Sequence, residues 1–160
     1  PLIYFVDVPG FMIGSEAERE GTLRKGMQAL QALMDANVPM VSVYIHKAYG
    51  MAGLATGNAS RLNLRLSWPT AEWGDMPIEG GVFAAHRREI QAASDPDDFR
   101  SRIETRMRAA ASPWKTAEAF GVEEMVEPTE PRGMIVRFLR SSQAAIRGNL
   151  GPKARYGTRL

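Results

Sequence analysis

Residues 2–14 read LIYFVDVPGFMIG, and this stretch decides the fold. The apolar run at residues 2–6 is typical of a strand that is buried on both faces of a parallel sheet. Pro9 and Gly10 then mark a loop. Apolar residues at intervals of four and three follow, which predicts one helix from its N-cap, Ser15, to about Asn37. The chain therefore opens with a strand, a loop and a helix.

The same order of elements occurs a second time. Residues 41–45 are predicted to form a strand, and the glycine-rich turn at 49–53 opens a short helix from Ala52 to about Ala59. A repeated strand–loop–helix order predicts an α/β fold with a mostly parallel sheet. The remaining expected elements are strands at 64–68 and 71–76, helices at 82–92, 96–111, 113–120 and 131–142, and an extended segment at 123–126. Helical periodicity is lost after residue 142, so we expect one domain over 1–142 and a C-terminal tail over 143–160.

The amino-acid composition excludes several classes of protein to which the chain could belong. The chain has 160 residues, 44% of them hydrophobic, and a net charge of +2, which suits one globular domain. It has no cysteine, which excludes disulfides, iron–sulfur clusters and cysteine nucleophiles and fits a reducing cytosol. No apolar stretch reaches the length of a membrane-spanning helix and there is no signal peptide, so we expect no membrane partner. Because the chain opens on Pro1 directly before a strand pattern, we expect a fragment of a longer protein.

The tail is basic. From Arg137 to Leu160 there is no acidic residue, and the basic ones are Arg137, Arg140, Arg147, Lys153, Arg155 and Arg159. Such a run could bind phosphate or nucleic acid. A solubilising tail or a subunit contact is the favoured interpretation, because no aromatic residues alternate with the basic ones, and we expect no nucleic-acid partner.

Few side chains suggest catalysis. The two histidines, His46 and His86, have no partner at metal-ligand spacing, and the motifs of metalloproteases, of serine hydrolases and of nucleotide-binding loops are absent from the sequence. Both histidines are interpreted as structural or exposed residues. Asp7 ends a strand beside a loop, where a carboxylate can be catalytic or can accept hydrogen bonds from backbone amides; we favour the second role.

Two loops are better candidates. The loops at 9–14 and 49–53 each follow a strand, precede a helix and contain glycine. In a parallel sheet both lie at the carboxyl edge, where ligands bind, and amides at the start of a helix can stabilise an oxyanion. The same glycines could serve only tight turns and close packing of helix on sheet, and the residues alone do not decide between these readings.

At these two loops, residues 5–14 read FVDVPGFMIG and residues 47–50 read KAYG. They resemble the V-D-V-P-G-F-x-x-G signature and the K-A-Y-G loop of a known family, the carboxyltransferase β subunits of biotin-dependent acyl-CoA carboxylases, which include the propionyl-, acetyl- and methylcrotonoyl-CoA enzymes. Residues 68–72, WPTAE, and the later pair Gly80-Gly81 match in order and spacing. Similar matches continue through residues 112–119 and 126–132 to the closing residues 151–160, so the resemblance covers nearly the whole chain.

The resemblance implies a crotonase-like ββα superhelix, present here as a partial domain. In the family a duplicated fold gives two halves, and this chain is similar to most of the C-terminal half without its first elements. The N-terminal half binds the acyl-CoA and the C-terminal half binds biotin, with the active site between halves of different subunits. The implied activity is transfer of a carboxyl group from carboxybiotin to the α carbon of an acyl-CoA, with backbone amides and proximity in place of a general base.

The resemblance also implies the site residues. The amides that hold the biotin oxygen carry over to Met51 and Ala52. The surrounding biotin-binding positions carry over to Gly10, Phe11, Gly14, Tyr49, Gly50, Gly53 and Leu54. Met51 stands where propionyl-type members have glycine, and Gly53-Leu54 replaces residues that influence the choice of acyl chain. Residues 75–79, DMPIE, also depart from the family pattern, so the next turn is expected to differ in shape.

The implied partners are a biotin carboxylase and biotin carboxyl carrier subunit, the N-terminal carboxyltransferase half, and further copies in a homo-oligomer built from dimers. The implied location is the cytoplasm, or the mitochondrial matrix in a eukaryote. One alternative is a crotonase-fold hydratase or isomerase, which would show a catalytic glutamate near the second loop; residues 54–60 contain none. The other alternative is a non-catalytic, truncated paralogue that acts in assembly.

Overall fold

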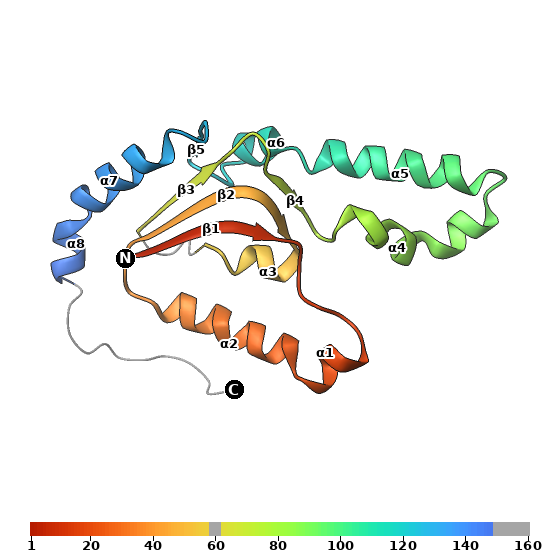
Figure 1. The fold of residues 1–160 in the computed structure, drawn as a ribbon, viewed down its shortest axis with the longest axis horizontal. Helices are drawn as coiled ribbons and strands as arrows, with labels where there is room; N and C mark the ends of the chain where they lie inside the picture. The colour runs from red at the N-terminus through yellow and green to blue at the C-terminus, as the bar shows by residue number, and fades with distance from the viewer. Residues whose placement is uncertain (58–61, 149–160) are drawn as a thin grey trace.

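A parallel sheet forms the centre of the computed structural model, which describes residues 1–57 and 62–148 (Figure 1). Its strands are β1 (Leu2–Val8), β2 (Met40–Tyr49), β3 (Asn63–Ser67), β4 (Glu72–Gly74) and β5 (Glu124–Met125). The order is β1-β2-β3-β5, and the short β4 pairs with the end of β2. Every strand pair among the described residues is parallel, as the repeated strand–loop–helix order predicts.

Because β1 and β2 are parallel neighbours, the loops that follow them lie at one edge of the sheet, as expected. Near this edge the Asp7 carboxylate accepts the backbone N–H of Lys47 at 3.1 Å and lies 3.2 Å from Nδ1 of His46. Asp7 therefore joins the ends of β1 and β2, which agrees with the amide-accepting role favoured from the sequence.

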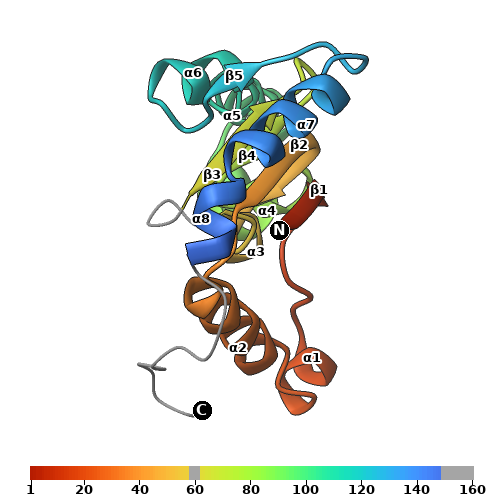
Figure 2. The same ribbon diagram turned by 90° about the vertical axis from the view of Figure 1, so that its left-hand side faces the viewer.

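Helices surround the sheet. In Figure 1, α1, α2 and α3 lie below it and α7 lies to its left, while α4 and α5 run side by side away from it. Figure 2 shows from another side that α7 passes in front of the strands, on which Ile135 packs, and that α1 and α2 stand apart from them. The bounds are α1 (Ser15–Arg19), α2 (Thr22–Asp35), α3 (Gly50–Leu54), α4 (Ile78–Ala92), α5 (Pro96–Ala110), α6 (Pro113–Glu118), α7 (Pro131–Ser141) and α8 (Gln143–Gly148).

Several expected helices differ in the structure. The single helix predicted from Ser15 to Asn37 is two helices, because Gly21 adopts a left-handed conformation at φ 68° between them. Ser15 is not an N-cap; it is the first residue of α1, after Gly14. The helix predicted at 52–59 begins earlier, at Gly50, and ends at Leu54.

The other bounds agree within a few residues, with three exceptions. The strand predicted at 41–45 is longer, because β2 continues to Tyr49. The helix predicted from residue 82 starts at Ile78, directly after Pro77, whose fixed φ suits the entry to a helix. The tail, predicted to lack periodicity, begins with α8. In that basic tail, Arg137, Arg140 and Arg147 lie exposed on α7 and α8, whereas Lys153, Arg155 and Arg159 and the resemblance at 151–160 fall outside the described residues.

Successive side chains of β2 point to opposite faces of the sheet, so β2 contributes to two separate apolar clusters. Val41 and Val43 point to one face, where they pack with Leu66 and with Ile135 of α7. Tyr44 and Ala48 belong to a second cluster, with Val6, Ala71 and Val122. A third cluster lies between α4 and α5 and includes Val82 and Ile90. The second cluster borders the site described below.

The prediction that β1 is buried on both faces is wrong. Val6 is its one fully buried residue, and Phe5 is 63% exposed. The reason is position: β1 is the edge strand of the sheet and pairs only with β2 among the described strands. An edge strand whose first residues, 2–6, are all apolar is a ready template for pairing with another chain.

We expect the isolated 160-residue chain to self-associate. Phe5 on β1, Leu23 on α2 and Leu54 on α3 are all more than half exposed, and association would remove this apolar surface from water. Sedimentation velocity at micromolar concentration should show dimers or larger species, and Phe5→Lys should shift the distribution towards monomer. A single sharp monomer peak for the unchanged chain would contradict the expectation.

Within the described ranges, no helix combines the length and the apolar character that a membrane crossing requires.

Candidate functional site

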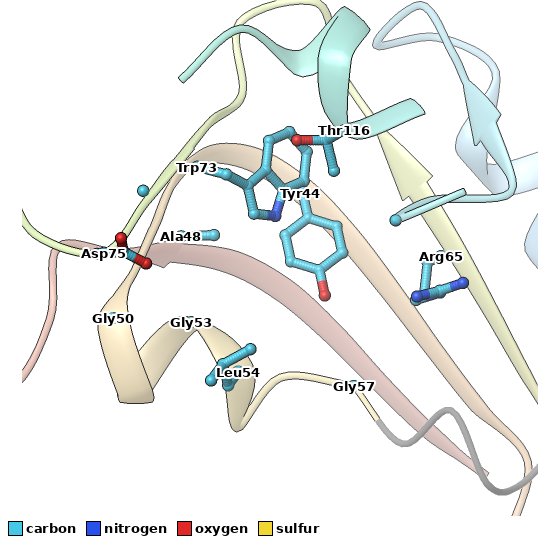
Figure 3. Close-up of a pocket in the computed structure, with 12 residues that line it drawn as sticks. Tyr44, Ala48, Gly50, Gly53, Leu54, Gly57, Arg65, Trp73, Asp75 and Thr116 are labelled. Carbon is cyan, nitrogen blue, oxygen red and sulfur yellow. The ribbon is translucent and has the colours of Figure 1, made fainter. Parts of the chain in front are cut away.

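A pocket of about 520 Å³ opens between the end of β2, α3, β4 and α6 (Figure 3). Its walls come from segments that are far apart in the sequence. The lining residues are Tyr44, Ala48, Gly50, Gly53, Leu54, Gly57, Arg65, Trp73, Gly74, Asp75, Thr116 and Gly121.

Close packing fixes α3 at the pocket. Gly50, at φ 60°, turns the chain out of β2 and into α3. A Cβ atom on Gly53 would lie 2.6 Å from the carbonyl carbon of Ala48, so only glycine lets α3 rest directly on the end of β2. The glycines of this loop therefore serve a tight turn and close packing, whatever else the loop does.

The amides of Met51 and Ala52 lie in the first turn of α3. Amides in a first helical turn have no acceptor within their own helix. In the described part of the chain, neither amide donates to a backbone carbonyl elsewhere. The Met51 side chain is 41% exposed, whereas Ala52 is buried.

An aromatic pair forms one wall of the pocket. The rings of Tyr44 and Trp73 are tilted, with centroids 5.0 Å apart. The hydroxyls of Tyr44 and Thr56 are hydrogen bonded at 3.2 Å, and burial raises the pKa of Tyr44 above its ordinary value. Tyr44 therefore presents an aromatic ring and a protonated hydroxyl at the pocket.

Arg65 lies at the end of the pocket nearest Gly57 (Figure 3). Its Nη2 donates to Glu123 at 2.6 Å and to the carbonyl of Phe120 at 3.0 Å, and its Nε donates to Glu123 as well. The hydrogen bond with Glu123 raises the pKa of Arg65 further. Arg65 thus ties β3 to the segment before β5, and its charge is already paired.

We expect Arg65→Met to lower the free energy of unfolding by about 1–2 kcal/mol. Charged hydrogen bonds contribute roughly 1.5–3 kcal/mol, and the 40% exposure of the Glu123 side chain reduces that figure through solvent screening. Urea denaturation measures the change. The matched control is Arg102→Met, which breaks an exposed pair with Asp98 on α5 and should cost about 0.5 kcal/mol or less. Equal losses in the two variants would contradict this role for Arg65.

The structure brings together only some of the residues expected from the sequence. Gly50, Gly53 and Leu54 line the pocket, and Met51 and Ala52 share their helix. Tyr49 is buried beneath, where its hydroxyl donates to Glu72 at 2.9 Å.

Gly10, Phe11 and Gly14 do not reach the pocket. They lie in the β1–α1 loop, and the Phe11 ring packs so closely on Gly26 that an added Cβ there would be 2.4 Å from Cζ. Sequence reasoning missed the lining residues Tyr44, Arg65, Trp73, Asp75 and Thr116. Of these, Tyr44 could have been found, because it shares a face of β2 with Ala48 by strand alternation.

The fold is an α/β domain with a pocket beside the end of β2 in a parallel sheet. The chain belongs to the carboxyl transferase domain family, whose model matches residues 1–156. It is 36% identical over 142 residues to the carboxyltransferase subunit of propionyl-CoA carboxylase from Haloferax mediterranei, covering 88% of this chain and 28% of that one. It is 32% identical over 159 residues to the biotin-dependent acetyl-/propionyl-coenzyme A carboxylase beta5 subunit of Mycobacterium leprae, covering 96% and 29%.

A solved structure is also similar. The hexameric transcarboxylase 12S, crystallised with methylmalonyl-coenzyme A and methylmalonic acid, superposes with a TM-score of 0.79 at 32% identity, over 99% of this chain and 30% of that one. These findings confirm the carboxyltransferase family and the α/β, crotonase-like fold. The chain spans less than a third of the length of these relatives, so it corresponds to part of a carboxyltransferase subunit.

Proposed function

We propose that this chain forms the biotin side of the carboxyltransferase site in a biotin-dependent acyl-CoA carboxylase. The observation that supports the proposal is that the backbone amides of Met51 and Ala52 lie in the first turn of α3, next to residues that line a pocket, and that neither donates to a backbone carbonyl outside the helix within the described residues. Family membership supports it, because relatives that carry the same domain are named as carboxyltransferases of acyl-CoA carboxylases.

The residues present suit the ureido group of biotin. That group presents a neutral carbonyl oxygen, which two adjacent N–H groups can bind without a charged side chain. When bound, carboxylated biotin supplies the carboxyl group that is transferred. The Met51 and Ala52 amides donate to its ureido oxygen and stabilise the negative charge that develops there. Because Gly53 seats α3 directly on Ala48, these donors are held in place before reaction begins.

The remaining parts of the site belong to other polypeptide segments or subunits in this proposal. They are the half that binds the acyl-CoA, a biotin carboxylase with its biotin carboxyl carrier, and further copies of the subunit in a dimer-based oligomer. A relative described as a hexamer supports such an assembly. The proposal includes a location in the cytoplasm, or in the matrix of a mitochondrion.

The test is reconstitution. We expect the assembled enzyme to co-purify with a biotinylated subunit and to carboxylate an acyl-CoA, and we expect the 160-residue chain alone to show no carboxyltransfer. Turnover of an acyl-CoA by the isolated chain would contradict the division of the site between two halves. Biotin-independent hydration or isomerisation by the assembly would instead favour the hydratase alternative, and a folded assembly without any activity would favour the non-catalytic paralogue.

A further inference from the structure

We infer that the Asp75 carboxylate accepts a hydrogen bond from the ureido N–H of biotin and orients the ring at the start of α3. This inference rests on the proposed function, because it adds a second contact to the group that the Met51 and Ala52 amides are proposed to hold. Asp75 belongs to residues 75–79, where the sequence departs from the family pattern, so the resemblance assigns it no role.

The pairing of β4 with β2 brings Asp75 to the start of α3. Gly74, the last residue of β4, is the register partner of Tyr49. The residues that follow them, Asp75 and Gly50, are therefore neighbours. A Cβ atom on Gly50 would lie 3.2 Å from the backbone carbonyl oxygen of Asp75, so this close approach favours glycine. Figure 3 shows the Asp75 side chain close to Gly50, and both residues line the pocket.

The Asp75 carboxylate is an unused hydrogen-bond acceptor. Asp75 is exposed, and within the ranges that the structure describes its carboxylate has no hydrogen-bond or ion-pair partner. It therefore does not occupy the amides of the first turn of α3, as a capping carboxylate would. A carboxylate acceptor and the two amides of the proposed function thus lie at the same end of the pocket.

A ureido edge matches this arrangement of donors and acceptor. The ureido group presents a carbonyl oxygen and, on the adjacent nitrogen, an N–H, so one edge of the ligand can accept from the amides and donate to a carboxylate. An acyl thioester presents a carbonyl oxygen without a neighbouring N–H and would leave Asp75 unpaired. Because hydrogen bonds to ionised acceptors are stronger than those between neutral groups, Asp75 favours a ureido ligand at this end of the pocket.

The charge of Asp75 also orients a carboxylated ring. In carboxybiotin one ureido nitrogen, N1′, carries the negatively charged carboxyl group, and the other, N3′, keeps its N–H. Two carboxylates repel each other at short range, whereas N3′–H can donate to Asp75. The ring should therefore bind with N3′ at Asp75 and with the carboxyl group on the side away from it.

The experiment measures the binding of biotin methyl ester to the 160-residue chain by titration calorimetry. Derivatives methylated at N3′ or at N1′ test the two nitrogens separately. Methylation at N3′ should weaken binding about tenfold, which is the effect of losing one hydrogen bond to a charged group at an exposed site, and methylation at N1′ should change Kd less than about twofold. Asp75→Leu should bind all three probes with the same Kd.

Asp97→Leu is the matched control. It also removes one exposed carboxylate, but Asp97 lies in the first turn of α5 and outside the pocket lining, so this variant should keep the preference for a free N3′–H. If Asp75→Leu does not fold by circular dichroism, Asp75→Asn serves instead. Its amide oxygen still accepts a hydrogen bond, but a neutral bond is roughly half as strong, so the preference should fall to about threefold.

Equal Kd values for biotin methyl ester and its N3′-methyl derivative would overturn the inference. An unchanged preference in the Asp75 variants, or no binding of biotin methyl ester at all, would overturn it too. The proposed function is measured separately, as carboxyltransfer by the assembled enzyme. Carboxyltransfer together with equal Kd values would refute this inference alone, whereas a clear N3′ preference in a chain whose assembled enzyme transfers no carboxyl group would refute the proposed function alone.

Discussion

Ala52→Pro is expected to lower the kcat of the assembled carboxyltransferase by about 10²–10³-fold. Proline has no backbone N–H, so the substitution deletes one of the two donors proposed for the ureido oxygen. The loss of a single donor of this type raises the barrier by roughly 2.7–4 kcal/mol. Ala52 is buried in the first turn of α3, so the thermal midpoint must be measured beside the rate.

Two control variants separate catalysis from packing. Ala52→Ser keeps the amide and adds only a hydroxyl, and Met51→Gly keeps the amide and removes an exposed side chain. Both should retain kcat within a few-fold. If the proline variant folds with an unchanged midpoint and transfers carboxyl groups at nearly the normal rate, the donors lie elsewhere. If it loses stability but keeps full activity per folded molecule, residues 51 and 52 serve packing alone.

Gly53→Ala is expected to destabilise the fold by about 1–3 kcal/mol. The added Cβ would lie 2.6 Å from the carbonyl carbon and 2.8 Å from the carbonyl oxygen of Ala48. These are backbone atoms, so α3 must move away from β2, and overpacking of this kind typically costs about 1–3 kcal/mol. Chemical denaturation of the chain measures the loss.

Gly81→Ala is the matched control for Gly53→Ala. Its Cβ would approach Cγ and Sδ of Met76 at 3.1 Å, but Met76 is a flexible side chain and can move aside. Alanine is also preferred over glycine within a helix by up to about 1 kcal/mol. This variant should be neutral or stabilising. If the two alanine substitutions have the same effect, the contact between α3 and β2 is not the constraint that we describe.

The sequence predicted the sheet well for a physical reason. The apolar run within β2 and the glycine turn after it are local signals, and the order of strand, loop and helix leaves parallel pairing as the natural arrangement. The second loop was found for the same reason, since Gly50 and Gly53 mark both a turn and a close contact. The first loop, with Gly10 and Gly14, has the same local signals, yet the structure does not place it at the pocket.

The features that the sequence did not predict depend on contacts between residues that are far apart in the chain. Trp73, Thr116 and Arg65 meet in the pocket because three separate segments pack there, and no local pattern in those segments indicates it. β1 has the composition of a buried strand, but its exposure depends on what covers the edge of the sheet. Gly21 shows another limit, because a glycine inside a predicted helix can be tolerated or can interrupt the helix, and the sequence alone does not decide which.

The central place of β2 has a consequence for how the chain reaches its native state. β2 pairs with β1, β3 and β4, and residues as distant as Leu2 and Met40, or Leu66 and Glu124, must find one another. Pairings of such long sequence separation slow folding. At about 5–20 residues per second of synthesis, β1 leaves the ribosome seconds before its partner strand exists. During that interval Ile3, Tyr4 and Phe5 are available to chaperones and to other nascent chains, so the yield of native protein in cells should depend on chaperone supply and on the rate of translation across residues 9–39.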